Sequence, residues 1–264
     1  MKKFWLWMIV LIMLFAAACS SKDEKPSVTE ETQASTETTY ETVETETTVV
    51  TEMTEETTVA TEPIWPTEVQ EELILENLKP YYEKNHDLVG WIRVPDTKID
   101  NPVMQTSLDN RNYYLDKDFE HKYNKAGTLY IREQCDVFWP SDNLVIYGHN
   151  MANNTMFGIL DKYRKQDYWQ NNQYIYFDTL YEQHKYQIFA VFKTSANEGE
   201  GYPYHRFNDA ASAEEYDAFI STIKSMAFYD TGITPQYGDE LITLSTCEYT
   251  LNNGRLVVVA YLVE

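Results

Sequence analysis

Cysteine is scarce in this chain: its 264 residues include only Cys19, Cys135 and Cys247. No C-x-x-C or H-x-x-x-H pair occurs, so the spacing offers no zinc site, and we expect no metal and no cofactor. Small disulfide frameworks usually carry more cysteines, which leaves a Cys135–Cys247 bridge as the one structural alternative for these two thiols. An unpaired thiol here therefore calls for a chemical explanation.

Long apolar runs are also missing, apart from residues 4–18. This run is shorter than the ~20 residues that a membrane-spanning helix needs. Lys2 and Lys3 precede it and three alanines end it, so we expect residues 1–18 to be a secretory signal sequence. The ending resembles the lipobox of bacterial lipoproteins, in which Cys19 is the lipidated first mature residue; an uncleaved signal-anchor is the alternative. Both interpretations put the rest of the chain outside the cytoplasmic membrane.

Positive charge is absent between Lys25 and Lys79. Residues 26–78 hold fourteen glutamates and no aspartate, which is two thirds of the formal net charge of −21. A segment of Thr and Glu cannot bury enough apolar surface to fold, and its like charges repel. We expect residues 19–68 to be an acidic, disordered stalk. The remaining residues 79–264 carry −9, which argues against nucleic acid as a ligand.

One folded domain is expected over residues 69–264, a length that is ample for a hydrophobic core. Short runs rich in Val, Ile, Tyr and Thr alternate with turn residues, which predicts a mainly β (α+β) fold, a barrel or a sandwich. The expected strands are residues 90–94, 128–131, 143–147, 174–177, 186–192, 241–246 and 256–262. A short helix around residues 73–78 is expected to stop at Pro80. The spacing of Tyr216, Phe219, Ile220 and Ile223 predicts a longer helix over residues 213–226.

Three chemically capable residues stand at the ends of expected strands. Cys247 ends one apolar run, and Arg255 opens the next run eight residues later. His149 follows the run 143–147, after a glycine that permits a tight exit from a strand. A lone histidine is more often a surface or packing residue than a catalytic one. The combination of Cys, His and Arg at strand ends is what raises all three to candidates.

A thiol with an ordinary pKa of about 8.5 is mostly protonated at neutral pH. A neighbouring imidazolium or guanidinium lowers that pKa and creates a nucleophile. The histidine can then move protons to and from amines, and the arginine can hold a carbonyl or stabilise an oxyanion. These roles describe acyl transfer through a thioester. The His-before-Cys order and the absence of a C-G-S-C-W signature argue against a papain-like enzyme.

The same residues resemble those of class B sortases of Gram-positive bacteria, from about Asp87 to Val263. The motifs that carry the resemblance are Thr243–Cys247 with Arg255 downstream, Tyr147–Met151, Val89–Ile92, Ile99–Asp100 with Pro102–Val103 and Gln105, Tyr114–Leu115, Lys125–Thr128, Met156–Gly158, and the helical segment followed by Tyr229–Ile233. The resemblance implies an eight-stranded β-barrel with an N-terminal helix and a helix inserted before the Cys-bearing strand.

The resemblance also implies a cysteine transpeptidase that cleaves a C-terminal sorting signal of the NPxTN or LPxTG kind. Cys247 would attack the Thr carbonyl, His149 would handle protons, and Arg255 would position the substrate or stabilise the oxyanion. The implied partners are surface proteins with a sorting signal and an amine of the peptidoglycan cross-bridge. The implied location is the extracytoplasmic face of the cell membrane. No acidic cluster supports the calcium site of class A enzymes.

By motif match, the substrate groove would include Leu115, Tyr202, Ser245 and Glu248. The Gly-rich loop 197–203 leaves Tyr204 as an alternative to Tyr202. Two other functions stay open at this point. One is a pilin-polymerising sortase whose acceptor is a lysine amine. The other is a non-catalytic barrel that displays or binds wall ligands.

Overall fold

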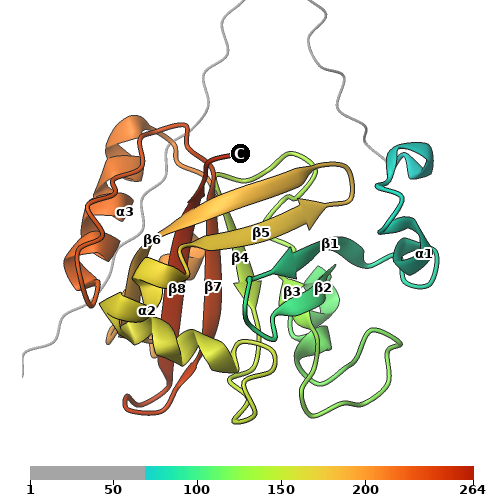
Figure 1. The fold of residues 1–264 in the computed structure, drawn as a ribbon, viewed down its shortest axis with the longest axis horizontal. Helices are drawn as coiled ribbons and strands as arrows, with labels where there is room; N and C mark the ends of the chain where they lie inside the picture. The colour runs from blue at the N-terminus through green and yellow to red at the C-terminus, as the bar shows by residue number, and fades with distance from the viewer. Residues whose placement is uncertain (1–68) are drawn as a thin grey trace, which may run out of the picture. The chain divides into compact units, whose positions relative to one another are not determined.

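The computed structural model describes residues 69–264, and the expected signal sequence, Cys19 and stalk lie outside the described residues. Eight strands close into a barrel in the order β1-β2-β3-β4-β7-β8-β6-β5 (Figure 1), which confirms the expected fold class. The strands are β1 Leu88–Arg93, β2 Asp100–Gln105, β3 Leu129–Ile131, β4 Asn143–Tyr147, β5 Tyr174–Thr179, β6 Gln183–Ser195, β7 Leu241–Glu248 and β8 Gly254–Leu262. The helices are α1 Lys79–Tyr82, α2 Gln166–Asn171 and α3 Ala213–Met226, with short 3-10 turns η1 Glu71–Leu73, η2 Leu108–Asn110, η3 Tyr113–Leu115, η4 Gly158–Arg164 and η5 Tyr204–Arg206.

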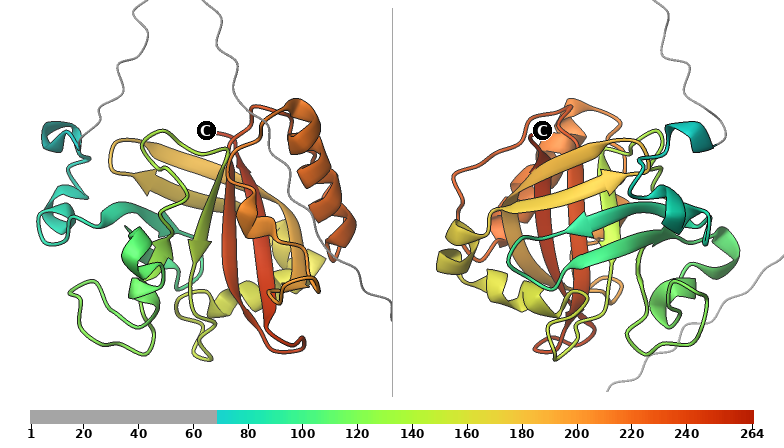
Figure 2. Two further views of the ribbon diagram at one scale, coloured as in Figure 1. Left: turned by 180° about the vertical axis from the view of Figure 1, so that it is seen from behind. Right: turned by 45° about the vertical axis from the view of Figure 1, so that its right-hand side comes forward.

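Two strand pairs in the barrel are parallel, β2 with β3 and β4 with β7, and the others are antiparallel. A parallel pair needs a crossover, and the crossover from β4 to β7 contains α2, β5, β6 and α3. As a result β7 lies between β4 and β8, and these three strands run side by side in Figures 1 and 2. They are the three strands whose ends carry the candidate catalytic residues.

The barrel interior is filled by branched and aromatic side chains from all the strands, with Leu244, Val257 and Phe192 among those without any exposed surface. In β7, every residue is buried except Cys247. A strand that is buried on both faces must be apolar or hydrogen-bonded throughout, so the single break in that burial marks where β7 reaches the surface. The thiol is therefore displayed at the barrel rim by the way the core is packed.

The segment before the barrel packs on a second, smaller apolar cluster through Ile74, Leu78 and Tyr82. Its helix, α1, begins at Lys79 with Pro80 in the first turn. The helix expected around residues 73–78 is therefore wrong: η1 ends at Leu73, α1 starts only at Lys79, and Pro80 stands at the beginning of a helix and does not stop one. A proline in the first turn costs nothing, because its missing N–H would have no partner within the helix.

The prediction of a helix over residues 213–226 is confirmed by α3. Ser212 caps it by accepting a hydrogen bond from the Glu215 N–H at 3.3 Å, and Lys224 lies in its last turn. The four residues that set the spacing are buried, and this face packs against β6 on the outside of the barrel (Figure 2). No helix among residues 69–264 combines the length and apolar character that crossing a membrane requires.

One strand, β2, is absent from the sequence prediction because Pro102 interrupts its pattern. Pro102 pairs with Trp91 of β1, but the pairing of β2 with β3 begins only at Val103. Pro102 therefore has a neighbouring strand on one side only, which is the edge position where a proline is tolerated.

Candidate active site

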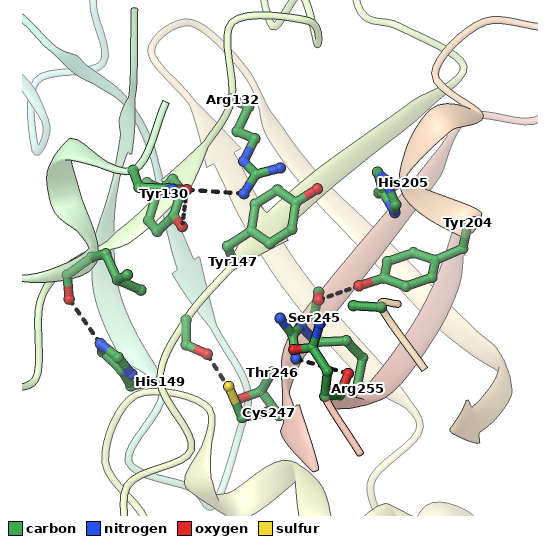
Figure 3. Close-up of a pocket in the computed structure, with 15 residues that line it drawn as sticks. Tyr130, Arg132, Tyr147, His149, Tyr204, His205, Ser245, Thr246, Cys247 and Arg255 are labelled. Carbon is green, nitrogen blue, oxygen red and sulfur yellow. Dashed lines mark hydrogen bonds between the residues drawn. The ribbon is translucent and has the colours of Figure 1, made fainter. Parts of the chain in front are cut away.

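A cleft of about 430 Å³ opens where the ends of β4 and β7 meet the start of β8 (Figure 3). Its lining includes all three candidate catalytic residues. The lining residues are Asn112, Leu115, Tyr130, Arg132, Tyr147, Gly148, His149, Ala196, Tyr204, His205, Ser245, Thr246, Cys247, Asn253 and Arg255.

Cys247 and Arg255 are direct partners in the antiparallel pairing of β7 with β8. Side chains of such partners stand about 5 Å apart at Cβ, so the thiol and the guanidinium share one stretch of surface. Arg255 Nη1 donates to the carbonyl oxygens of Asn253 at 3.2 Å and Gly254 at 2.8 Å, which holds the side chain at the tip of the β7–β8 turn. No carboxylate forms an ion pair with Arg255 among the described residues, so its charge is not neutralised locally.

His149 reaches the cleft through the parallel pairing of β4 with β7, in which Tyr147 is the partner of Ser245. The register continues beyond β4: the Gly148 N–H donates to the Ser245 carbonyl at 3.1 Å. The side chain of Asn150 then donates to the Cys247 carbonyl at 2.9 Å. These bonds fasten the segment around His149 to the end of β7, so Figure 3 shows Cys247 between His149 and Arg255.

The ring of His149 has a defined orientation. Its Nε2 lies 2.8 Å from the carbonyl oxygen of Leu115. A carbonyl oxygen can only accept, so Nε2 carries the hydrogen and donates it. Nδ1 is therefore the ring nitrogen left to exchange protons with the cleft.

Gly148 is needed for this exit from β4. A Cβ atom there would lie 2.3 Å from Leu129 Cδ2 and 2.8 Å from Phe157 Cδ2, both in the packed core. The absence of a side chain lets the chain turn against the core and bring His149 to the rim.

Two of the four predicted substrate residues, Leu115 and Ser245, line the cleft. Ser245 Oγ and Tyr204 Oη are hydrogen-bonded at 2.5 Å, and both residues are buried. Tyr202 does not lie in the cleft. Its ring packs beside Phe219 of α3, and its N–H donates to Thr194 Oγ1 at 2.8 Å. The structure thus puts Tyr204, the alternative, in the position expected for Tyr202.

Glu248 also points away from the cleft. Its carboxylate is buried and accepts hydrogen bonds from Arg164 at 2.8 Å and from the N–H groups of Thr250 at 3.0 Å and Leu251 at 3.1 Å. Burial disfavours the charge, but the hydrogen bonds from Thr250 and Arg164 outweigh it and hold the pKa of Glu248 below its ordinary value. Glu248 is therefore not among the residues that line the cleft, and its contact with substrate stays a prediction; in this structure its carboxylate braces the β7–β8 turn that carries Arg255.

The second thiol of the domain, Cys135, is buried and apart from the cleft. It is free, as is Cys247, so the alternative of a Cys135–Cys247 disulfide is excluded. Burial raises the pKa of Cys135 to about 11, which makes it a poor nucleophile. Among the described residues, no group of three or more His, Cys, Asp or Glu side chains is placed to hold a metal ion.

A further group of residues in the cleft was not predicted from the sequence. Arg132 directly follows β3, and its guanidinium carbon lies 4.5 Å from the centre of the Tyr147 ring. Tyr130 stacks on Tyr147, and Arg132 Nη2 donates to Asn112 Oδ1 at 2.9 Å. The only signal in the sequence is an arginine at the end of an apolar strand, the same signal that singled out Arg255.

The arrangement suits nucleophilic attack on a carbonyl carbon. A thiol between an imidazole and a guanidinium has a proton partner on one side and a fixed cation on the other. The cleft is lined by three tyrosines, Leu115 and a larger number of polar and basic side chains, so it offers both packing surface and hydrogen-bonding groups to a peptide.

Comparison with known proteins agrees with this geometry. The family model for the sortase domain matches residues 92–263. A protein named sortase B from Staphylococcus aureus is 30% identical over 195 residues, which cover 72% of this chain and 77% of that protein. A sortase B from Listeria monocytogenes is 28% identical over 207 residues, 78% of this chain and 81% of that protein.

Solved structures give the same result. A Staphylococcus aureus sortase B–substrate complex is similar with a TM-score of 0.65 at 29% identity, and the match covers 73% of this chain and 87% of that one. A sortase B from Bacillus anthracis, in complex with AAEK1, has a TM-score of 0.64 at 33% identity over 75% and 89% of the two chains. A sortase B complexed with triglycine has a TM-score of 0.64 at 28% identity over 71% and 85%.

Proposed function

The chain belongs to the class B sortases, a family of cysteine transpeptidases, and we propose that it cuts a C-terminal sorting signal of the NPxTN or LPxTG kind and joins the new carboxyl end to an amine. The observation that carries the proposal is the register of Cys247 opposite Arg255 with His149 at the end of the adjacent strand. The similarity to a sortase B–substrate complex supports a peptide as the substrate.

Acylation begins once the Cys247 thiol has passed its proton to Nδ1 of His149, and the resulting thiolate attacks the carbonyl carbon of the Thr residue in the signal. A C–S bond forms, and the carbonyl π electrons move onto oxygen. When the tetrahedral intermediate collapses, the C–N bond breaks and His149 gives its Nδ1 proton to the leaving amine. The product is a thioester between Cys247 and the substrate protein.

Deacylation reverses these roles. The acceptor amine attacks the thioester carbonyl, His149 takes the proton that the amine loses, and the C–S bond breaks to release the Cys247 thiolate. A peptide bond now joins the substrate protein to the acceptor. The similarity to a sortase B complexed with triglycine supports a peptidoglycan cross-bridge amine as the acceptor.

Arg255 stabilises the negative charge that develops on the substrate carbonyl oxygen. Its guanidinium keeps donors free beyond the two backbone carbonyls that it already binds, and it stays charged throughout the reaction. A prearranged donor of this kind is typically worth about 10²–10³ in rate, or about 3–4 kcal/mol. Leu115, Ser245 and Tyr204 form the walls along which the signal lies.

The proposed place of action is the outer face of the membrane. The expected signal sequence at residues 1–18, with lipidation of Cys19 or retention as a signal-anchor, would hold the chain there. The stalk at residues 19–68 would carry the catalytic domain toward the cell wall.

The test is turnover of fluorogenic NPxTN and LPxTG peptides by the purified protein, with triglycine, a diaminopimelate-containing peptide or a pilin offered as the amine. Wild-type enzyme should cleave at least one peptide and form a product with a wall-type amine. A thioacyl adduct at Cys247 should appear by mass spectrometry, and Cys247→Ala should abolish both. Selective use of the pilin lysine would replace wall anchoring by pilin polymerisation, whereas activity that survives Cys247→Ala would refute the catalytic proposal.

A further inference from the structure

The cleft is cationic in an acidic protein. The chain as a whole has a formal net charge of −21, yet the fifteen lining residues include Arg132, Arg255, His149 and His205 and no aspartate or glutamate. Arg255 already has a role in the proposed mechanism, which leaves Arg132 unexplained.

Arg132 is held in place but left with unused donors. Its guanidinium lies over the face of Tyr147, 4.5 Å from the ring centre, and Nη2 donates to Asn112 Oδ1 at 2.9 Å. Its Nε is buried and has no hydrogen-bond partner, and no ion pair involves Arg132 among the described residues. A buried donor without a partner costs about 1–3 kcal/mol, so a guanidinium kept in this state is prepared for an acceptor that arrives with a ligand.

The two arginines act on the same groups. The hydroxyl of Tyr204 lies in the field of both: burial raises its pKa, and the hydrogen bond to Ser245 opposes that rise, followed by Arg255 and Arg132. The pKa of His205 is lowered, first by burial and then by Arg132, Arg206 and Arg255. An anion bound in the cleft therefore meets a combined positive field and not a single charge.

Arg132 lies close enough to the Cys247 thiol to contact the same bound peptide. It covers Tyr147, which pairs with Ser245, two residues before Cys247 along β7. Two residues of β-strand span about 7 Å, which is also the length of two residues of extended peptide. A group bound by Arg132 thus belongs to a residue within about two positions of the reacting bond.

The geometry points to Arg132 and Asn112 as a subsite for a carboxylate, which makes Arg132 a specificity-determining residue of this enzyme. A guanidinium binds a carboxylate through two parallel hydrogen bonds, and the amide N–H2 of Asn112 remains available as a further donor. The subsite rests on the proposed function, since it names the chemistry of the peptide that the cleft takes. The carboxylate comes either from an acidic side chain beside the scissile bond of the sorting signal or from the acceptor.

Matched substrate pairs distinguish these two sources. Donor peptides that differ only by Asp or Asn at each position within two residues of the scissile bond test the signal. Triglycine and triglycinamide, which differ in the terminal carboxylate, test the acceptor. Wild-type enzyme should prefer the carboxylate member of one pair by about tenfold in kcat/KM, as a charge-assisted hydrogen bond predicts.

Arg132→Gln should remove that preference while it leaves kcat/KM for the neutral member within about twofold, because only the charge-assisted contact is lost. Arg132→Lys keeps the positive charge but loses the planar pair of N–H donors, so it should retain part of the preference that Arg132→Gln loses. Arg206→Gln is the control: it removes the same charge from an exposed neighbour of His205 that does not line the cleft.

An equal loss of kcat/KM for both members of a pair in Arg132→Gln would mean that Arg132 only supports Tyr147, and the proposal would be overturned. Equal use of Asp and Asn, and of triglycine and its amide, by wild-type enzyme would overturn it too.

A second measurement separates this subsite from the proposed function, because it needs no turnover. The rates at which iodoacetate and iodoacetamide alkylate Cys247, read by peptide mapping, compare an anionic with a neutral reagent of similar size. Arg132→Gln should lower the iodoacetate-to-iodoacetamide ratio at least about threefold, and Arg206→Gln should not, because Arg132 lines the cleft and Arg206 does not. If no peptide is turned over but the ratio falls, the transpeptidase proposal fails and the anion subsite stands. An unchanged ratio overturns the subsite.

Discussion

The Nε2–H of His149 donates to the carbonyl oxygen of Leu115 at 2.8 Å, so a backbone atom 34 residues away in sequence fixes the tautomer of the proposed acid–base residue. Leu115 lies at the end of the turn η3, and its side chain lines the same cleft. One residue therefore contributes an apolar wall and an acceptor that orients the imidazole.

This relationship predicts different effects on catalysis and stability. His149→Gln places an amide that can still donate to the Leu115 carbonyl but cannot move a proton. We expect kcat/KM to fall by about 10²–10⁴ with little change in the midpoint of thermal unfolding. His149→Ala serves as the comparison, with a similar loss of activity. Retention of a tenth or more of wild-type activity by His149→Gln would show that the imidazole does not handle the proton.

The buried hydrogen bond between Tyr204 and Ser245 predicts an energetic coupling. Tyr204→Phe and Ser245→Ala should each lower the free energy of unfolding by about 1–3 kcal/mol, because each leaves a partner unsatisfied or a small void. The double variant should lose about 1 kcal/mol less than the sum of the single losses. Urea titration of the four proteins measures this, with Tyr261→Phe as a control for loss of a partly exposed hydroxyl. Strict additivity would mean that the two hydroxyls do not interact in solution.

The Arg164–Glu248 ion pair predicts that loss of Arg164 destabilises the fold by an amount that depends on pH. The pKa of Glu248 is lowered, so its contribution to stability is present above its ordinary pKa of about 4.3 and is lost as the pH falls through the folded-state pKa. Arg164→Met leaves the buried Glu248 carboxylate without its charged partner, so it should lower the free energy of unfolding by about 3 kcal/mol at pH 7. This cost should shrink as the pH falls below the ordinary value of about 4.3, because the Glu248 carboxyl that has lost Arg164 then takes up a proton and is no longer a buried charge.

Urea unfolding of wild type and Arg164→Met at pH 7, 5 and 3.5 checks this expectation. Lys185→Met is the matched control, since Lys185 pairs with the exposed Glu264 and should matter little at any of these pH values. A penalty for Arg164→Met that stays constant with pH would assign its origin to lost packing, for instance on Phe228, and not to the charge.

The two thiols of the domain should differ sharply in reactivity. Iodoacetamide at pH 7.5 should alkylate Cys247 within minutes and leave Cys135 unmodified, because Cys135 is buried and its pKa is raised to about 11. Peptide mapping by mass spectrometry separates the two sites, and unfolding in guanidinium should make their rates equal. Rapid labelling of Cys135 in the folded protein would contradict its burial in the core.

Most of the barrel could be predicted from sequence because strands such as β4 and β7 are buried on both faces, and because most strands read as short runs rich in Val, Ile and Tyr. Pro102 hid β2, since its tolerance depends on where β3 begins to pair, and pairing across the barrel leaves no local trace. Pro80 led to the opposite error, a predicted helix end where a helix begins, because the effect of a proline depends on whether it lies in the first turn of a helix or later.

The site residues likewise divide into those whose positions follow from local sequence and those whose positions depend on distant contacts. Cys247, His149 and Arg255 stand at ends of predicted strands, and the register between these strands brings them together. Tyr202 and Glu248 were assigned to the groove by motif position, but side-chain direction is set by contacts with α3 and Arg164 that lie far away in sequence. Arg132 was missed for a related reason, because it contacts Tyr147 of the neighbouring strand β4, and that pairing leaves no local trace in the sequence.

The parallel pairing of β4 with β7 has a consequence for the timing of reactivity. Asn150 and Cys247 are 97 positions apart, and no local turn can bring their strands together. We expect contacts of such long range to form late in folding, because the loop between them must be closed first. In a newly made chain the Cys247 thiol therefore lacks the neighbouring His149 imidazole, and we expect it to be unreactive in acyl transfer until the barrel closes. Unfolded molecules are protected in this way from joining themselves to stray amines.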